Sequence, residues 1–340
     1  MVDENKNRKR RFTIICLGIL LVLATVFSFT IGRYPIGIKD VCGAILSPFF
    51  PINQYWSDAT EKILFNIRLP RILLGSLVGC CLSASGAAYQ GVFQNPLAAP
   101  DLLGATAGAS FGAALGILLR VNGQMITVFA FFFSLVTIAL VWLISSKAMG
   151  KRAIGFIITG IMVGSLFSAG TSFIKLVADP YDQLPAITYW LMGSLGGATM
   201  KDVTFALLPM SIGLLPLLLL RWRINILTLG DDEAQSMGIN AKKVRLIVVL
   251  AATLVTASSV AVSGAIGWVG LVIPHMARRL VGNNFRYLMP ASMLLGALFL
   301  LIVDNVSRNL LATEIPLGIL TAFIGVPFSI YLIVKRSDIT

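Results

Sequence analysis

The sequence predicts an all-α polytopic membrane protein with about ten transmembrane helices and an inverted internal repeat. Of its 340 residues, 57% are hydrophobic and only 12% are charged, whereas an ordinary soluble domain carries about 25% charged residues. A helix that crosses the roughly 30 Å hydrocarbon core of a bilayer needs about 20 apolar residues. The chain offers many such stretches separated by short polar ones, so most of it has lipid or protein as its solvent.

The apolar runs divide the chain into an N-terminal tail (1–11), one ten-helix domain (12–334) and a C-terminal tail (335–340). The first run follows five basic residues, but it is too long for the apolar core of a signal peptide. No small-x-small cleavage site precedes Gly32 either, so this run is expected to be a span. The predicted spans lie at 12–32, 68–88, 102–119, 124–146, 153–177, 204–220, 244–263, 265–280, 287–304 and 314–334.

Basic residues are distributed unevenly between the two sides of the predicted membrane. With the N-terminus inside, 18 of the 27 Lys and Arg residues fall on the cytoplasmic side, as the positive-inside rule requires. Both termini are therefore expected in the cytoplasm, and the net charge of +12 is explained as a topology signal. A nucleic-acid partner is not expected, because no basic groove with interleaved aromatic residues appears.

An internal echo supports the repeat. When the chain is shifted by 178 residues, Ser85-Gly86-Ala87 falls on Ser263-Gly264-Ala265, and Asn95-Pro96 falls on Ile273-Pro274. The echoed segments begin in spans two and seven, so the two halves would cross the membrane in opposite directions. Inverted repeats of this kind are common in transporters.

Small residues recur at helical spacing on the fifth predicted span, at Gly160, Gly164 and Ser168. Spacing of four places them on one helix face, where small side chains let backbones approach closely. Tight helix packing is favoured over direct contact with a transported molecule, although the second interpretation stays open.

The chain carries no recognisable catalytic or metal-binding constellation. No G-x-x-x-x-G-K-[ST] loop occurs, so the chain cannot be an ATPase by itself. His275 is the only histidine, and a single imidazole makes neither a triad nor a metal site. The four cysteines, Cys16, Cys42, Cys80 and Cys81, lack metal-ligand spacing. No catalytic residue, metal or cofactor is expected in this subunit.

Two acidic residues lie near predicted spans, and both fall at outer ends. Asp304 stands four residues before Arg308, a spacing that allows them to pair on one helix turn. Glu314 opens the tenth span, where a carboxylate favours the positive helix end. Neither has the mid-membrane position that an ion-coupled carrier needs.

A polar segment between spans six and seven predicts a short cytoplasmic helix. Asp231, Asp232 and Glu233 suit a helix start, and Gly238 suits a stop. The segment is either a solvated loop or a docking element for a cytoplasmic partner, and its position alone does not decide between them.

Several motifs together resemble the permeases of iron-siderophore, haem and vitamin B12 ABC importers, the FecCD-type or type II importer family. The resemblance extends from about residue 60 to 332, and the shared order and spacing of the motifs carry it. The matching stretches are Arg68-Leu-Pro-Arg71, Ser85-Gly86-Ala87 with Gln90, Asn95-Pro-Leu-Ala98, Leu103-Gly104 with Gly108-Ala109, Trp190-x-x-Gly193, Leu229-Gly-Asp231 with Ala234 and Gly238, Gly264-Ala-Ile-Gly267 running to Gly270-Leu-Val-Ile-Pro-His275, Asp304 with Arg308, and Glu314-Ile-Pro-Leu-Gly318.

The resemblance implies a non-catalytic permease domain in the cell inner membrane. It implies a homodimer, or a dimer with a close homologue, that works with two cytoplasmic ATPases and an external substrate-binding protein. The short helix would meet the ATPase, which assigns coupling to Gly230, Asp231, Asp232, Ala234 and Gly238. External arginines of this family receive acidic residues of the binding protein, and Arg68, Arg71 and Arg308 match them. Our topology independently places all three outside, against the positive-inside trend.

The expected function is import of an iron chelate, haem or a cobalamin-type ligand by alternating access, driven by the partner ATPase. Gate residues vary in the family, and a small polar pair found in some members falls near Ala153 and Ile154, so only the region is carried over. An ion-coupled secondary transporter is the main alternative, and an intramembrane enzyme is a second one that lacks a nucleophile and base.

Overall fold

The computed structural model describes residues 2–47, 50–147 and 152–337, and it contains no β-strand in those ranges. The elements in order are α1 (Val2–Thr30), α2 (Ile38–Leu46), α3 (Asp58–Lys62), the π-helix η1 (Ile63–Arg68), α4 (Leu69–Val92), the 3₁₀-helix η2 (Pro100–Leu103), α5 (Ala105–Leu118), α6 (Gly123–Lys147), α7 (Arg152–Val177), α8 (Gln183–Leu191), α9 (Met200–Leu219), α10 (Arg221–Leu227), α11 (Asp231–Ser236), α12 (Ala241–Ser263), α13 (Val269–Val281), α14 (Phe285–Asn309) and α15 (Leu317–Ser337).

Each of the ten predicted spans coincides with a helix, namely α1, α4, α5, α6, α7, α9, α12, α13, α14 or α15. Among the described residues, seven helices are long and apolar enough to cross a membrane, and Ala105–Leu118 and Leu317–Tyr331 are shorter apolar helices. The polytopic all-α fold is therefore confirmed. Helix α1 begins at Val2, so most of the predicted N-terminal tail is helical, and α15 continues into the predicted C-terminal tail.

Helices α5 and α13 are shorter than the spans predicted for them. Helix α5 begins after Gly104, whose φ is 74°, and α13 begins after Trp268, whose φ is 69°. A left-handed residue cannot continue a helix, so the chain before each of these positions takes another path. The short helices α5 and α13 follow α4 and α12, the two helices in which the sequence echo begins. Both halves of the repeat therefore have a long helix followed by a short one.

Helices α4 and α12 pack against each other and run antiparallel. Hydroxyl groups join Ser85 to Thr256 at 2.8 Å and Tyr89 to Thr253 at 2.6 Å. From the first pair to the second, the residue number increases on α4 and decreases on α12, so the two helices run in opposite directions, as an inverted repeat requires. These side chains are buried, and such hydrogen bonds hold helices together where apolar contact alone gives no preference over lipid.

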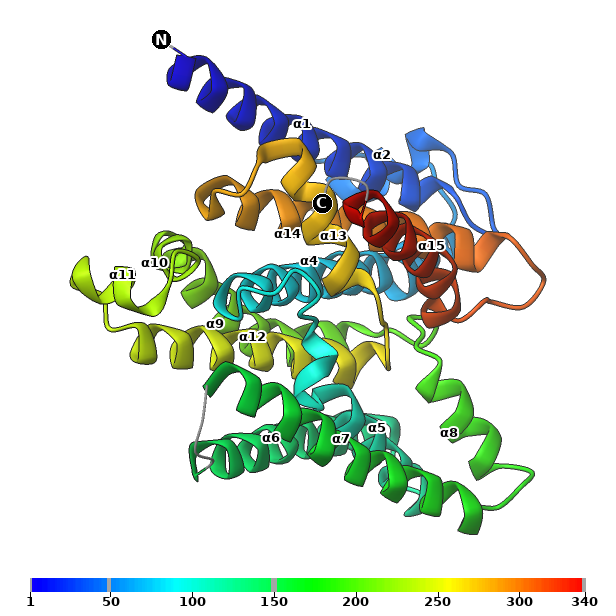
Figure 1. Ribbon diagram of the computed structural model, residues 1–340. Coiled ribbons are helices and arrows are strands. Elements are labelled where there is room, and N and C mark those ends of the chain that lie inside the picture. Colours follow the sequence, from blue (N-terminus) through cyan, green and yellow to red (C-terminus); the bar gives the residue numbers. More distant parts are fainter. Residues whose placement is uncertain (1, 48–49, 148–151, 338–340) are drawn as a thin grey trace.

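Small residues let the neighbouring helices approach α4 closely. A Cβ atom added at Gly79 would collide with the backbone carbonyl of Gly296 on α14, and one added at Gly86 would collide with Gly270 on α13. Helix α4 is consequently buried on most of its surface. Figure 1 shows α4 and α12 at the centre, with α1 and α14 on one side and α5, α6 and α7 on the other.

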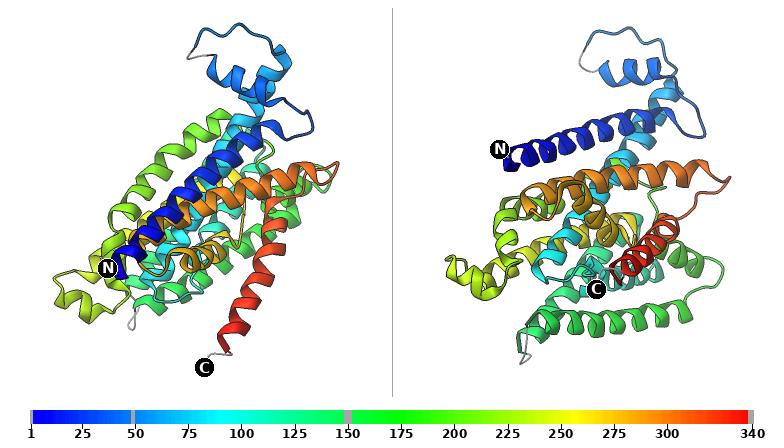
Figure 2. Two further views of the ribbon diagram at one scale, coloured as in Figure 1. Left: turned by 90° about the horizontal axis from the view of Figure 1, so that it is seen from above. Right: turned by 45° about the horizontal axis from the view of Figure 1, so that its top comes forward.

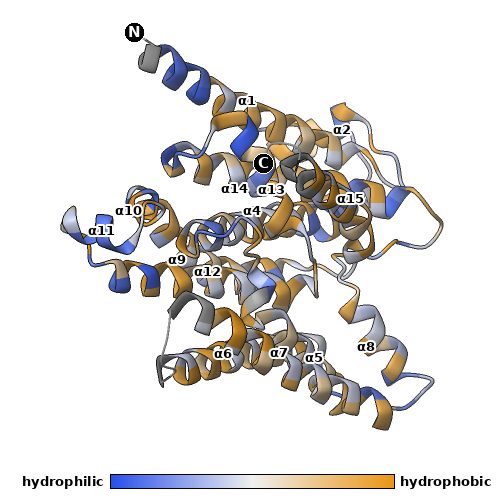
Figure 3. Cartoon of the chain, viewed as in Figure 1, coloured by the Kyte–Doolittle hydropathy of each residue, from blue (hydrophilic) through white to orange (hydrophobic). Residues whose placement is uncertain are grey.

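Many large hydrophobic side chains are exposed on the helices, and hydrophilic segments gather toward the ends of the molecule (Figure 3). The N-terminus of α1 and helix α11 lie toward the same end, whereas the α14–α15 connection lies at the opposite end (Figures 1 and 2). We call these the α11 end and the arginine end, the latter defined by Arg68, Arg71 and Arg308. Side chains that are far apart in sequence meet at both.

Candidate functional site

The three predicted docking arginines come from three elements and converge at the arginine end. Arg68 closes η1, Arg71 lies in the first turn of α4, and Arg308 lies in the last turn of α14. Their exposed fractions are only 3%, 5% and 7%. The structure thus brings the three residues together but covers them with other parts of the chain, rather than leaving their guanidinium groups extended into solvent or lipid headgroups.

Arg71 is held between two carboxylates. Its Nε lies 2.9 and 3.1 Å from the two oxygens of Asp304, and its Nη1 lies 2.8 Å from Oε1 of Glu314. Asp304 was expected to pair with Arg308, but Arg308 Nε is 4.0 Å from the nearest Asp304 oxygen. Arg71 makes the closer contact, because its Nε donates to both Asp304 oxygens and its Nη2 also lies 2.9 Å from Oδ1.

Arg68 and Arg308 hold the C-terminal end of α1. Arg68 donates to the carbonyls of Phe29 and Tyr34, and Arg308 donates to the carbonyl of Ser28 at 2.9 Å and to the Asn305 side chain. The last four carbonyls of a helix lack partners within it, and a cation there also faces the negative end of the helix dipole. These two arginines therefore cap α1 and fasten it to η1 and α14.

Glu314 is the accessible member of this group. Its side chain is 32% exposed, whereas that of Asp304 is 1% exposed. Partial burial alone would raise the pKa of Glu314, but the hydrogen bond and charge of Arg71, with Arg33 and Arg308 nearby, hold the pKa below its usual value. The backbone carbonyl of Glu314 also accepts a 3.4 Å hydrogen bond from the Tyr189 hydroxyl of α8.

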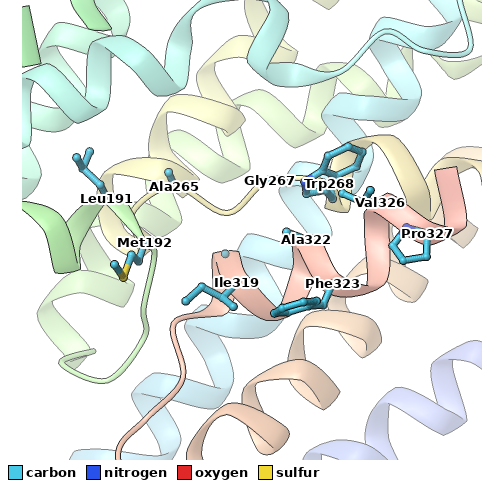
Figure 4. Close-up of a pocket in the computed structure, with 11 residues that line it drawn as sticks. Leu191, Met192, Ala265, Gly267, Trp268, Ile319, Ala322, Phe323, Val326 and Pro327 are labelled. Carbon is cyan, nitrogen blue, oxygen red and sulfur yellow. The ribbon is translucent and has the colours of Figure 1, made fainter. Parts of the chain in front are cut away.

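An apolar pocket of about 660 Å³ lies next to the start of α15. Figure 4 shows Leu191 and Met192 at the end of α8, the segment that leads to Trp268, and the α15 residues Ile319 and Phe323 around it. Leu317 and Gly318 donate backbone hydrogen bonds to the carbonyls of Gly193 and Met192 at 2.9 and 3.0 Å. Helix α15 is thus fixed by its first turn and borders open space beyond it.

The short helix predicted at the other end is present as α11. Gly230 precedes it with a φ of 138°, and Gly238 follows it with a φ of 76°, so both glycines occupy conformations that other residues rarely adopt. Ala234, within α11, is completely buried. Asp232 and Glu233 are exposed, so α11 presents an acidic surface while Ala234 fixes its underside.

Sequence reasoning missed Arg245, which joins α11 to α12. Its Nη1 and Nη2 atoms lie 3.0 and 2.6 Å from the two oxygens of Asp231. The hydrogen bond from Arg245 is the main reason that the pKa of Asp231 lies below its usual value. A signal was available, because a cation near a helix N-terminus opposes the helix dipole and requires a carboxylate nearby.

The predicted pathway residues divide between packing and exposure. Gly160 and Gly164 are buried and lie against Gly104, at the junction of η2 and α5. Ser168 is exposed one turn further along α7. The side chains of Ala153 and Ile154 lie outside the described residues. Helix packing therefore accounts for both glycines, and Ser168 stays a candidate for the pathway.

No group of three or more His, Cys, Asp or Glu side chains that could hold a metal occurs among the described residues. His275 Nε2 lies 2.8 Å from the carbonyl oxygen of Pro96, so this histidine packs the chain after α4 against α13. This contact between two elements is typical of a structural residue. The fold and these two ends define a polytopic helical membrane protein whose polar groups hold helices together.

The chain belongs to the FecCD transport family, whose model matches residues 20–335. It is a non-catalytic transport subunit. It is 38% identical over 327 residues to the "Molybdate import system permease protein MolB" of Haemophilus influenzae, with 94% of each chain covered. It is 39% identical over 301 residues to the "Probable iron chelatin transport system permease protein" of Helicobacter pylori, with 88% of this chain and 90% of the relative covered.

A solved structure is similar over almost the whole chain. It is described as "An inward-facing conformation of a putative metal-chelate type ABC transporter", and it has a TM-score of 0.84 and 38% sequence identity. The match covers 95% of this chain and 98% of that one. The resemblance stated from the motifs is therefore confirmed at the level of family and fold.

Proposed function

We propose that this chain is the membrane-spanning subunit of an ABC importer in the cytoplasmic membrane. The observation that carries the proposal is α11, a six-residue helix fixed by two left-handed glycines, a buried alanine and the Asp231–Arg245 ion pair. A helix this short is not stable alone. Four separate features fix the position of α11, which indicates that its position matters for function. Contact with a moving ATPase would require such a fixed position.

The mechanism is alternating access. Two ATPase subunits close on ATP, the displacement enters the permease through Gly230–Gly238, and α12 transmits it to α4 in the centre. A second copy of the chain, or a close homologue, completes the pathway beside the α7 face that carries Ser168. The external binding protein docks at the arginine end, where Arg68, Arg71 and Arg308 give an excess of positive charge over Asp304 and Glu314.

The ligand is an oxyanion or chelate of a metal, captured by the binding protein. The sequence favoured iron chelates, haem or cobalamin, but one relative of 38% identity is named for molybdate and another of 39% identity for an iron chelate. Relatives of equal similarity thus carry different ligands, which supports selection by the binding protein and widens the candidates to molybdate.

Reconstitution tests this function directly. The chain is placed in liposomes with an ATPase and a binding protein of an ABC importer from the same organism, and uptake of labelled molybdate and of a ferric chelate is measured. We expect uptake of one of them that requires ATP inside and survives collapse of the proton gradient. Uptake that follows the gradient with ATP absent would support the ion-coupled carrier instead.

A further inference from the structure

The two carboxylates on Arg71 differ in how firmly they are held. Asp304 is 1% exposed and contacts Arg71 through both oxygens, from within helix α14. Glu314 is 32% exposed, makes one 2.8 Å contact and lies in the connection between α14 and α15. A partly exposed single contact contributes little to stability, whereas loss of a buried partner is costly. Glu314 is therefore the carboxylate that can leave.

The charge of the cluster leaves room for another carboxylate. Arg68, Arg71 and Arg308 face two carboxylates, and Arg33 also lies near Glu314, so the arginines of this group outnumber its carboxylates. The Nε atom of Arg308 is buried and has no hydrogen-bond partner in the described part of the chain. An excess cation in a covered site favours an additional anion, and the exposed side of the cluster is the side that Glu314 covers.

We propose that Glu314 is an internal competitor for the binding protein: it occupies the outward side of Arg71 until an acidic residue of the docked protein replaces it. This inference rests on the proposed docking at the arginine end. It explains how a buried arginine can still serve as a docking residue, because the group that covers it is itself a carboxylate with the same chemistry as the incoming one.

The exchange has a structural consequence for α15. The backbone of the α14–α15 connection is held by Ser307, which exchanges hydrogen bonds with Ile315, and by the Tyr189 hydroxyl. The Glu314 side chain adds the link to α4 through Arg71. Its departure removes that link at the end where α15 is fixed, while the pocket of about 660 Å³ leaves space beside the next turns. Docking is thereby connected to the position of α15.

Binding affinity tests the competition. The probe is the binding protein that supports uptake with this chain in liposomes, and its Kd for the complete transporter in nanodiscs is measured for the wild type, Glu314→Gln and Asp182→Asn. Asp182 is an exposed carboxylate of the α7–α8 connection, so its variant removes the same charge without touching Arg71. If Glu314 covers Arg71 about nine times in ten, Glu314→Gln should bind about tenfold more tightly.

Salt and hydrogen exchange separate competition from a merely structural role. The gain in Glu314→Gln should shrink between about 0.1 M and about 1 M salt, as the screening length falls from about 10 to about 3 Å. Amide exchange over residues 310–318 should become faster in the wild type when the binding protein docks. That measurement needs no variant, so it remains decisive if Glu314→Gln folds poorly.

The outcomes are distinguishable. Tighter binding in Glu314→Gln, with Asp182→Asn unchanged within about twofold, supports the exchange. Unchanged or weaker binding in Glu314→Gln, with the wild type docking normally, overturns the exchange and leaves the proposed function standing. Unchanged exchange over 310–318 on docking also overturns it. No docking of the wild type at any salt concentration overturns both.

Discussion

At the scale of single residues, the arginine end shows why burial could not be predicted from sequence. The motif and the topology identify Arg68, Arg71 and Arg308 as a group, and the structure brings them together. Their partners, however, lie on α1 and on residues more than 200 positions away, and one sequence contains no information that links such positions. The nearest candidate partner, Arg308 for Asp304, is the weaker one.

Replacement of Arg71 should destabilise the permease because it leaves Asp304 as a buried carboxylate without its main partner. We expect Arg71→Met to cost about 3–5 kcal/mol, measured as a lower thermal midpoint of the purified protein in detergent. The double variant Arg71→Met/Asp304→Leu should recover part of the loss, and Arg33→Met, at an exposed position, should change stability by about 0.5 kcal/mol or less. Equal midpoints for wild type and Arg71→Met would contradict the assigned ion pair. Reversal of Arg71 to Glu is for the same reason a poor test of docking.

Arg245 should matter for coupling more than for stability. The Asp231 side chain is 52% exposed, and partly exposed ion pairs contribute about 0.5–1 kcal/mol. We expect Arg245→Gln to insert and fold normally while ATP consumed per ligand imported rises, with Lys243→Gln as the control on the same helix turn. Because the pKa of Asp231 is lowered, the ion pair persists above the usual pKa of about 3.9 and is lost only as the pH falls through the lower folded value. Acidification from about pH 7 to about pH 5 should therefore not reproduce the defect.

At the scale of elements, the existence of the spans followed from composition, whereas their ends depended on backbone conformation. The sequence predicted continuous helices over 102–119 and 265–280, but positive φ values at Gly104 and Trp268 shorten both. Glycine permits that conformation without requiring it, and a tryptophan rarely adopts it. In contrast, Gly238 was predicted to stop α11, and its φ of 76° confirms the stop. This end could be predicted because acidic residues marked the start of a short helix only a few positions before the glycine.

Gly238 provides a clean test of α11, since a Cβ atom added there would meet no atom within 4 Å. Any effect of substitution must then come from the backbone, where a left-handed conformation costs roughly 1–2 kcal/mol for most residues but less for asparagine. We expect Gly238→Val to lower uptake and to weaken the response of the ATPase to the binding protein. Gly238→Asn should retain most of both. Equal coupling in the two variants would show that transport does not depend on the backbone conformation at the end of α11.

At the scale of the whole molecule, the inverted repeat explains how one chain presents different chemistry at its two ends. Helices α4 and α12 are equivalent in the sequence echo and antiparallel in space, joined by buried hydroxyl groups. Segments that are equivalent in the repeat consequently end on opposite sides. One end of the molecule holds Arg68, Arg71 and Arg308, and the other holds α11. The orientation of the chain in the membrane therefore decides which partner meets which end.

Orientation is tested by labelling from the two sides. In a variant without Cys16, Cys42, Cys80 and Cys81, Asp58→Cys reports on the arginine end and Asp232→Cys on the α11 end; Asp232 is chosen because Asp231 is held by Arg245. The positive-inside distribution predicts that a membrane-impermeant maleimide labels Asp58→Cys in intact cells and Asp232→Cys only after permeabilisation. Both positions are exposed, so labelling of both in permeabilised cells is the control for reactivity. Labelling of both positions from one side would contradict the odd number of crossings between them. A reversed pattern would place the arginine end in the cytoplasm, where an external binding protein could not reach Arg71.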